Sequence, residues 1–212
     1  MELSRLVLAS GNPGKLREFR QLCEPLGLTI VPQSELSIGE AEEPHGTFIE
    51  NALAKARHAS RASGLPAFAD DSGICVAALG GAPGVRSARF ADAVAERETE
   101  NERYTQDARN NAKLVALLEG KADRSAHYTC VIVLVRHAND PEPLIAEGRW
   151  HGEIIAAPRG EGGFGYDPYF YLPALQKSAA ELPAHEKNAI SHRGKALTLL
   201  VARLQELVRP AA

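Results

Sequence analysis

The sequence predicts an α/β fold with one central, partly antiparallel β-sheet. Short apolar runs alternate with segments of helical periodicity along most of the chain. In the second half, two β-rich runs follow each other directly, which is typical of a hairpin. The chain has 212 residues, 44% of them hydrophobic, so a sizeable core can form. The pattern fits one α/β unit and also fits a division into two lobes around a cleft.

The first elements are predicted to be a strand, a tight loop and a helix. Arg5–Ser10 is an apolar run, and a Gly-Asn-Pro-Gly cluster follows it. Apolar residues then recur at helical spacing, at Leu16, Phe19, Leu22 and Cys23. A second short strand is expected at Leu28–Val31, and the polar, acidic stretch Pro32–Gly46 is expected to be a surface loop.

The next predicted elements are a helix over Phe48–Ser63 and a strand within Pro66–Val76. Thr47 and Glu50 have the spacing of a capping box at the start of this helix, and a glycine followed two residues later by a proline suits its end. Two aspartates are expected to interrupt the strand at the point where it becomes a turn. The loop Gly80–Gly84 follows.

The second half is predicted to contain two helices and two strands. A polar helix is expected over Thr99–Leu118, with Tyr104, Ala108, Ala112, Val115 and Leu118 on its buried side. Strands are expected at Tyr128–Val135 and Leu144–Trp150, joined by a wide hairpin, and a Gly-rich loop at Gly160–Asp167. The closing helix, Ser191–Val208, is amphipathic, with an apolar side at Ala196, Leu199, Leu200, Ala202, Leu204 and Leu207.

Composition excludes several classes of protein. The net charge of -3 and the pI of about 6.2 provide no overall basic field, so we expect no nucleic-acid or membrane partner. Cys23, Cys75 and Cys130 form no CxxC pair, so we expect small buried thiols in a reducing compartment and neither a zinc site nor a disulfide. The apolar run Leu6–Ala9 is too short for a signal peptide, which predicts a cytoplasmic protein.

The hexapeptide Ser10–Lys15, SGNPGK, lies between a predicted strand and a predicted helix. Backbone amides and the positive end of a helix dipole can bind phosphate oxygens there, and the lysine adds a full charge. The hexapeptide is not a P-loop, because Ala9 and Leu16 stand where that motif requires Gly and Ser or Thr. A simple turn with a solvated lysine is the alternative.

Asp70 and Asp71 are adjacent carboxylates at the end of an apolar strand. Since adjacent strand residues point to opposite faces, the two are expected to have different roles. One can hold a hard divalent cation or activate water, while the other anchors the turn. Glu40, Glu42 and Glu43 could complete a magnesium site. The alternatives are turn-forming aspartates and a solvated acidic loop.

Two later segments also carry polar groups and glycine. The Gly160–Asp167 loop contains Phe164 and Tyr166, which could stack on a base, although a tight hairpin would also use such a loop. Near the last helix, the cationic donors Lys187, His192 and Arg193 gather with Ser191 and Gly194, where surface charges are the alternative. A phosphorylated ligand between two lobes would use all four polar segments.

Six motifs together resemble those of the inosine/xanthosine triphosphate pyrophosphatases, the Ham1-like family, in its bacterial form. They are SGNPGK, TFIENALAKA, ADDSG, GGAPG, GGFGYDP and KNAISHRGKA, and they occur in order through nearly the whole chain. The resemblance implies an elongated α/β fold with a central mixed sheet flanked by helices and an active-site cleft between two lobes. It also implies that residues 1–212 form a single domain, that Mg²⁺ is required, and that the protein is a homodimer.

The resemblance also assigns site residues. The triphosphate loop comprises Ser10, Gly11, Asn12, Pro13, Gly14 and Lys15, with Lys55 as a further phosphate-facing lysine. Asp71 matches the proton acceptor and metal ligand, and Asp70 stands beside it as a further candidate ligand. Glu43 matches the metal-binding glutamate, with Glu42 and Glu40 as alternatives. Ser72 matches a serine that contacts the substrate. The loop residues Phe164, Gly165, Tyr166 and Asp167 match base and ribose contacts, and Lys187, His192 and Arg193 match residues at the purine.

The implied reaction is hydrolysis of non-standard purine nucleoside triphosphates (ITP, dITP and XTP) to the monophosphate and pyrophosphate. Magnesium, the lysines and Asp71 can supply charge neutralisation and a base without a covalent nucleophile. A cationic donor such as Arg193 or protonated His192 favours a 6-oxo base over adenine. Alternatives are a pyrophosphatase for modified pyrimidine nucleotides and a sensor that binds triphosphates without turnover.

Overall fold

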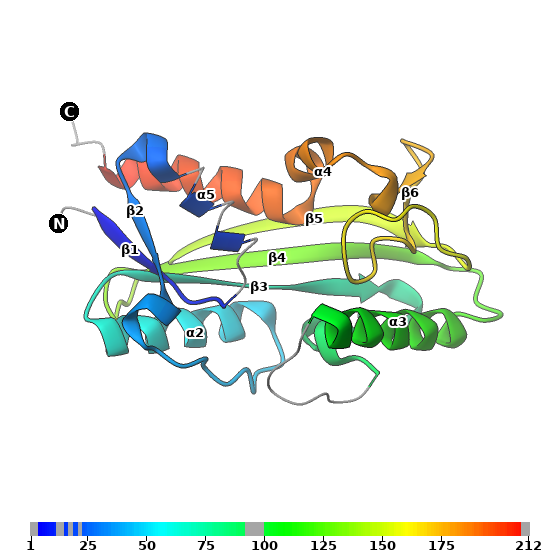
Figure 1. Ribbon diagram of the computed structural model, residues 1–212, viewed down its shortest axis with the longest axis horizontal. Coiled ribbons are helices and arrows are strands. Elements are labelled where there is room, and N and C mark those ends of the chain that lie inside the picture. The colour runs from blue at the N-terminus through cyan, green and yellow to red at the C-terminus, as the bar shows by residue number, and fades with distance from the viewer. Residues whose placement is uncertain (1–3, 12–14, 17–18, 21–22, 92–99, 209–212) are drawn as a thin grey trace. The chain divides into compact units, whose positions relative to one another are not determined.

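The structure is a computed structural model that describes residues 4–11, 15–16, 19–20, 23–91 and 100–208. Its sheet has seven strands in the order β2-β1-β3-β4-β5-β6-β7 (Figure 1). The strands are β1 (Arg5–Leu8), β2 (Thr29–Pro32), β3 (Ala67–Val76), β4 (Ser125–Val135), β5 (Leu144–Ile154), β6 (Phe170–Leu172) and β7 (Lys177–Ser178). The longer helices are α2 (Phe48–Ser63), α3 (Glu100–Leu117), α4 (Ala184–Ile190) and α5 (His192–Val208).

The sheet is mixed, as predicted. Strand β1 pairs in parallel with β2 and with β3, with Val7 opposite Val31 and Ala67. Strand β6 pairs antiparallel with β5 and with β7, with Tyr171 opposite Glu153 and Ser178. Helices flank the sheet, so the predicted fold class is confirmed.

The chain divides into two compact units. The first comprises the described residues up to Asp71 together with 130–148 and the described residues from Lys195 onward. The second comprises the described residues of 72–129 and 149–194. Strands β3, β4 and β5 contribute residues to both units. Each unit has its own buried core.

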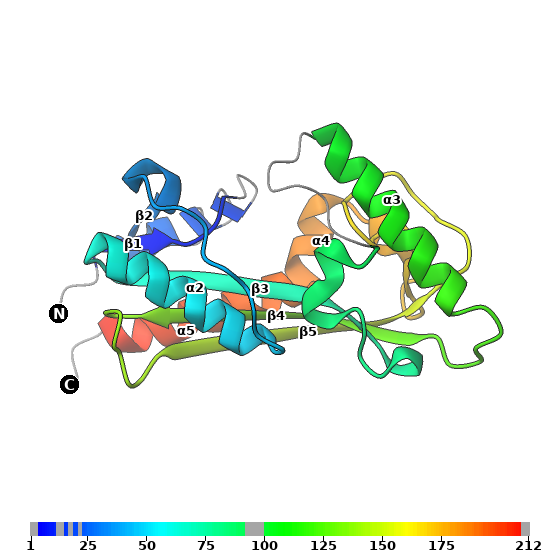
Figure 2. The same ribbon diagram turned by 90° about the horizontal axis from the view of Figure 1, so that it is seen from below.

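In the first unit, helices α2 and α5 cover opposite faces of the sheet (Figures 1 and 2). Alternate residues of each strand serve the two faces, because strand side chains alternate in direction. One cluster joins α5 to the sheet through Leu6, Leu8, Phe68, Ile132, Ala196 and Leu200. The other joins α2 to it through Val7, Ala67, Ala69, Val133, Ala52 and Ala56.

Helix α2 has the predicted bounds. Thr47 is its N-cap, since Thr47 Oγ1 accepts a hydrogen bond from the Glu50 backbone N–H at 3.3 Å. The Glu50 carboxylate accepts from the Thr47 hydroxyl at 2.6 Å, whereas in a capping box the Thr47 N–H would be the donor. The helix ends at Gly64, whose φ of +70° is the left-handed conformation that glycine adopts without steric cost. Local sequence therefore determines both ends of α2.

Two predictions about the strand and helix interiors were wrong. Strand β3 continues through Asp70 and Asp71, whereas a turn was expected there, because it is a central strand with partners on both sides. On α3, Ala108 and Ala112 are exposed. Amide side chains are buried in their place, at Gln106, Asn110 and Asn111.

The buried amides of α3 are hydrogen-bonded, which explains why they lie inward. Asn110 accepts from the Ala91 N–H at 2.8 Å and donates to the carbonyl oxygens of Ser87 and Ala88 at 3.3 and 3.1 Å. A buried polar group with partners loses little on burial. Helix α5 differs in a smaller way: Leu197 is buried, while Leu199 and Ala202 are exposed.

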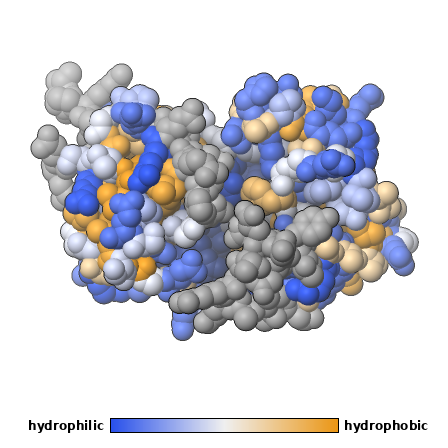
Figure 3. Space-filling view, in the orientation of Figure 1, coloured by the Kyte–Doolittle hydropathy of each residue, from blue (hydrophilic) through white to orange (hydrophobic). Residues whose placement is uncertain are grey.

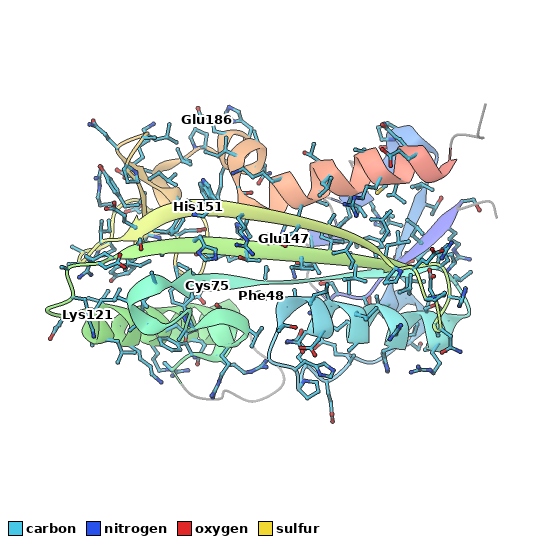
Figure 4. The ribbon with its side chains drawn as sticks, turned by 180° about the vertical axis from the view of Figure 1, so that it is seen from behind. Phe48, Cys75, Lys121, Glu147, His151 and Glu186 are labelled. Carbon is cyan, nitrogen blue, oxygen red and sulfur yellow. The ribbon has the colours of Figure 1, made fainter. Side chains whose placement is uncertain are left out.

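The surface is mixed in hydropathy, and the expectation of buried cysteines holds for two of the three. On the face drawn in Figure 3, hydrophilic and hydrophobic areas are interspersed over the described residues. Cys23 and Cys130 are buried, Cys75 on β3 is half-buried (Figure 4), and all three are free thiols. Within the described ranges, no helix is long and apolar enough to cross a membrane.

Asp140 organises the connection between β4 and β5. Its buried carboxylate accepts hydrogen bonds from the backbone N–H groups of Arg136 and Glu142 at 2.9 and 3.0 Å and pairs with the Arg136 guanidinium at 2.5 Å. The hydrogen bonds from Arg136 hold the pKa of Asp140 well below its usual value. The predicted hairpin therefore depends on one aspartate of the HANDPEP segment.

We expect Asp140→Asn to lower the free energy of unfolding by about 2 kcal/mol at pH 7, because hydrogen bonds to a charged acceptor are lost. Because the pKa of Asp140 is lower in the folded than in the unfolded protein, its carboxylate stabilises the fold at pH values above the unfolded pKa of about 4. This stabilisation is lost as the pH falls toward the folded pKa. The difference from wild type in urea unfolding should therefore shrink below pH 4. Glu142→Gln is the control, since Glu142 is exposed and should matter by less than about 0.5 kcal/mol.

Candidate active site

The two aspartates of β3 contact different lysines. Both side chains are buried, with exposed fractions of 2% for Asp70 and 8% for Asp71. Asp70 Oδ1 lies 2.8 Å from Lys15 Nζ. Asp71 Oδ1 lies 3.7 Å from Lys55 Nζ, and its Oδ2 accepts a hydrogen bond from Asn51 Nδ2 at 3.1 Å. The expectation of separate roles for adjacent strand residues agrees with this division of partners.

Lys55 joins three elements of the first unit. It projects from α2, and its Nζ lies 2.5 Å from Glu43 Oε1 in the acidic loop as well as near Asp71 of β3. Glu43 is half-buried, whereas Glu40 and Glu42 are exposed. The geometry therefore brings Glu43, and neither of the other two glutamates, to Lys55 and Asp71 among the contacts of the described residues.

Burial and charge tune these groups. Burial raises the pKa of Asp71, with further increases from Glu43 and Asp70, while Lys55 and the hydrogen bond from Asn51 act in the opposite direction. Burial lowers the pKa of Lys55, but the charges of Asp71, Glu43 and Asp70 outweigh it, so this pKa stands above its usual value. A carboxylate with a raised pKa is a better proton acceptor than an exposed one.

The donors around Lys55 fit a magnesium ion. Among the described residues, no group of three or more His, Cys, Asp or Glu side chains is arranged to hold a metal. Mg²⁺ requires less, since it is commonly held by one or two carboxylates together with water and substrate phosphates. Glu43 and Asp71 supply two carboxylates of this hard type. Asp70 contacts Lys15, and its part in a metal site stays a prediction.

The segment after β1 carries the predicted phosphate loop. Ser10 is half-buried and Gly11 is exposed, and Lys15 and Leu16 are helical. A Cβ at Gly11 would lie 2.9 Å from Glu40 Oε1, the end of an exposed side chain that can move aside. Asn12, Pro13 and Gly14 lie outside the described residues, so their assignment stays a prediction.

The second unit contains an exposed aromatic ring beside two cations. Phe164 is 60% exposed, and its ring centroid lies 4.9 Å from Lys187 Nζ and 6.0 Å from the Arg193 guanidinium carbon. Lys187 also forms an ion pair with the buried carboxylate of Asp167, which accepts a hydrogen bond from the Phe164 N–H at 2.9 Å. The loop thus presents one ring face and two positive charges together.

Two side chains of α3 form hydrogen bonds with the backbone of the Gly-rich loop. The Gly165 N–H donates to Asp107 Oδ2 at 2.7 Å, and the Gly165 carbonyl accepts from Asn111 Nδ2 at 2.8 Å. At Gly163 any side chain would overlap the Asp167 carboxylate, and φ is +76°. These contacts fix the loop conformation.

Three predicted substrate residues are more enclosed than Phe164. Tyr166 is 4% exposed and its hydroxyl donates to the Ser87 carbonyl at 2.8 Å. The His192 ring stacks on Tyr128, with centroids 4.7 Å apart and planes 9° apart. Ser72 is half-buried in β3. Their contacts with substrate stay predictions.

Sequence reasoning missed three residues that shape these sites: Asn51, Asp107 and Asn111. Asn51 stands four positions before Lys55, which places the two on one face of α2. That spacing could have indicated a shared role. Asp107 and Asn111 have the same spacing on α3, but their partner in the Gly-rich loop could not be read from the sequence.

Comparison with known proteins agrees with this architecture. The sequence profile described as "Ham1 family" matches residues 6–203. A protein of Ralstonia nicotianae named dITP/XTP pyrophosphatase is 65% identical over 96% of this chain and 98% of its own. A protein of Burkholderia pseudomallei with the same name is 64% identical over 96% of this chain and 95% of its own. The solved structure of a HAM1 protein from Coxiella burnetii has a TM-score of 0.88 and 50% identity, covering 95% of this chain and 98% of that one.

The chain belongs to the Ham1 family. The Ham1 profile begins within β1 and ends within α5, so it includes both the Lys55 cluster and the Phe164 loop. The likeness in structure extends over nearly the whole chain as well. The family resemblance inferred from six short motifs is therefore confirmed.

We expect Lys55→Met to lower the free energy of unfolding by about 3 kcal/mol at pH 7, because two carboxylates lose their shared counter-ion. Removing Lys55 also raises the pKa of Asp71 further, since Lys55 lowers it in the wild type. An acid whose pKa is higher in the folded state binds protons more readily when folded. The loss of unfolding free energy in Lys55→Met relative to wild type should therefore shrink as the pH falls from 7 to 5.

Urea unfolding at the two pH values measures this effect. Lys121→Met is the matched control, because Lys121 is exposed on the second unit (Figure 4) and should change stability by less than about 0.5 kcal/mol. If Lys55→Met loses the same free energy of unfolding at pH 5 and at pH 7, Lys55 does not lower the pKa of Asp71 as described.

Proposed function

We propose that this protein hydrolyses non-standard purine nucleoside triphosphates, ITP, dITP and XTP, to the monophosphate and pyrophosphate. The observation that carries the proposal is the cluster of Glu43, Lys55 and Asp71, which combines two carboxylates and a cation from three elements. The names of the relatives from Ralstonia and Burkholderia support the same activity and substrate class. The reaction removes these nucleotides from the nucleotide pool.

The first unit supplies the hydrolytic chemistry. Ser10, Asn12, Lys15 and Lys55 bind the triphosphate, where positive charge opposes the charge of the phosphate oxygens. Asp71 accepts a proton from the attacking water, a role that suits its raised pKa. Glu43 and Asp71 would hold Mg²⁺, which when bound neutralises phosphate charge and orients the reacting groups. No covalent nucleophile is needed.

The second unit supplies the base contacts. Phe164 offers an exposed face for stacking, and Lys187 and Arg193 offer donors beside it. His192 is a further proposed donor, on the strength of the family resemblance. Hypoxanthine and xanthine carry an acceptor oxygen at position 6, whereas adenine carries an amino donor there. Donors at this position therefore select 6-oxo purines, because adenine would face them with another donor.

We propose further that residues 1–212 act as one catalytic domain with two lobes, in a cytoplasmic homodimer without nucleic-acid or membrane partners. This rests on the family resemblance and on the modest net charge of -3. Light scattering of the purified protein tests the dimer, and a monomer at all concentrations would contradict it.

Pyrophosphate release from a panel of ITP, XTP, dITP, ATP, GTP and UTP is the direct test of substrate class. We expect rapid release from the first three only, and only with Mg²⁺. GTP also carries the oxygen at position 6, so its rejection requires that its amino group at position 2 meets a donor or finds no space. Comparable turnover of UTP would favour a pyrimidine-directed enzyme. Tight binding of ITP without turnover would identify a sensor and contradict the proposed hydrolysis.

The role of Asp71 has its own test. We expect Asp71→Asn to lower kcat at least about 10³-fold, because the base is removed, while the Kd for a non-hydrolysable ITP analogue changes only a few-fold. Asp123→Asn changes an exposed aspartate in the same way and should keep full activity. If turnover survives in Asp71→Asn, Asp71 is not the proton acceptor.

A further inference from the structure

One face of α2 holds the acidic loop in place. Asn51, Lys55 and His58 follow one another at intervals of four and three residues, so their side chains share that face. Asn51 binds the backbone of His45, Lys55 binds Glu43, and His58 Nε2 lies 3.1 Å from the Gly39 carbonyl oxygen. The loop that carries Glu43 is therefore attached to the helix at three points.

Asn51 differs from the other two because it is completely buried and bridges two elements. Its Oδ1 accepts the His45 N–H at 3.0 Å, and its Nδ2 donates to the His45 carbonyl at 3.3 Å and to Asp71 Oδ2 at 3.1 Å. These bonds use both hydrogens of the carboxamide and its oxygen. One side chain thus connects Asp71 to a backbone position two residues from Glu43.

We propose that Asn51 is a positioning residue that sets the relative placement of Glu43 and Asp71. Its effect on catalysis rests on the proposed function, in which these two carboxylates hold Mg²⁺. Groups that orient metal ligands typically change metal affinity or activity 10- to 100-fold when removed. Only a carboxamide suits the position, because aspartate could not donate to Asp71, and alanine would remove a partner of the buried Asp71 carboxylate and of two backbone groups of His45.

Asn51→Ala tests the proposal, with Ser60→Ala as the matched control. Ser60 is also buried on α2, with 2% exposure, and its hydroxyl donates to the Leu65 carbonyl at 2.8 Å at the far end of the helix. Both variants lose hydrogen bonds made by a buried side chain. Only Asn51→Ala loses the connection between the acidic loop and Asp71.

Three readouts should separate the two variants. In Asn51→Ala, hydrogen exchange of the His45 amide should accelerate at least about 10-fold, since its acceptor is removed. The Kd for Mn²⁺ on nucleotide-free protein, followed by electron paramagnetic resonance, should rise about 10- to 100-fold. The Mg²⁺ concentration for half-maximal activity should rise similarly, while the KM for ITP at saturating Mg²⁺ stays within about three-fold. Ser60→Ala should leave all three near wild type.

Every outcome decides the proposal. If Asn51→Ala and Ser60→Ala behave alike in amide exchange and Mn²⁺ binding, Asn51 is merely structural and the proposal is overturned. If Asn51→Ala does not fold, Asn51→Ser gives the same readouts, because a hydroxyl cannot reach all three partners. If the wild type releases no pyrophosphate while exchange and Mn²⁺ binding shift as expected, the proposed function fails and the positioning role stands.

Discussion

The burial of two carboxylates within the central strand β3 is the constraint on which the first unit depends. A buried charge without a partner would cost more than the fold can provide, so each aspartate requires a cation brought from another element. Lys15 and Lys55 meet this requirement from different helical segments. The need to neutralise Asp70 and Asp71 therefore places two lysines beside the residues that we propose for catalysis.

The same arrangement links stability to chemistry. Lys55 stabilises the folded first unit by pairing with Glu43 and Asp71, and it is also a proposed phosphate ligand. Burial still keeps the pKa of Asp71 above its usual value despite that pairing. The site thus presents two carboxylates, which suit a cation, beside one lysine, which suits a phosphate.

In the second unit, one aromatic ring is exposed while the residues around it are held by hydrogen bonds and packing. Tyr166 and His192 are held in the core by Ser87 and Tyr128, and Asp167 anchors the loop through the Phe164 N–H. Phe164 itself remains 60% exposed beside Lys187. A rigid loop loses little conformational freedom on binding, which favours selectivity for a flat base.

The sequence by itself determined the local features. The N-cap at Thr47, the glycine that ends α2 and the alternation of strand side chains all act between residues close in the chain, so composition and spacing reveal them. The order of six motifs likewise sufficed to identify the family. Only tertiary structure decided the continuation of β3 through Asp71, the inward amides of α3, the pairing of Glu43 with Lys55 and the bridge made by Asn51. Each of these depends on a partner distant in sequence, because the cost of burying a polar group is known only when its hydrogen-bond partner is in place.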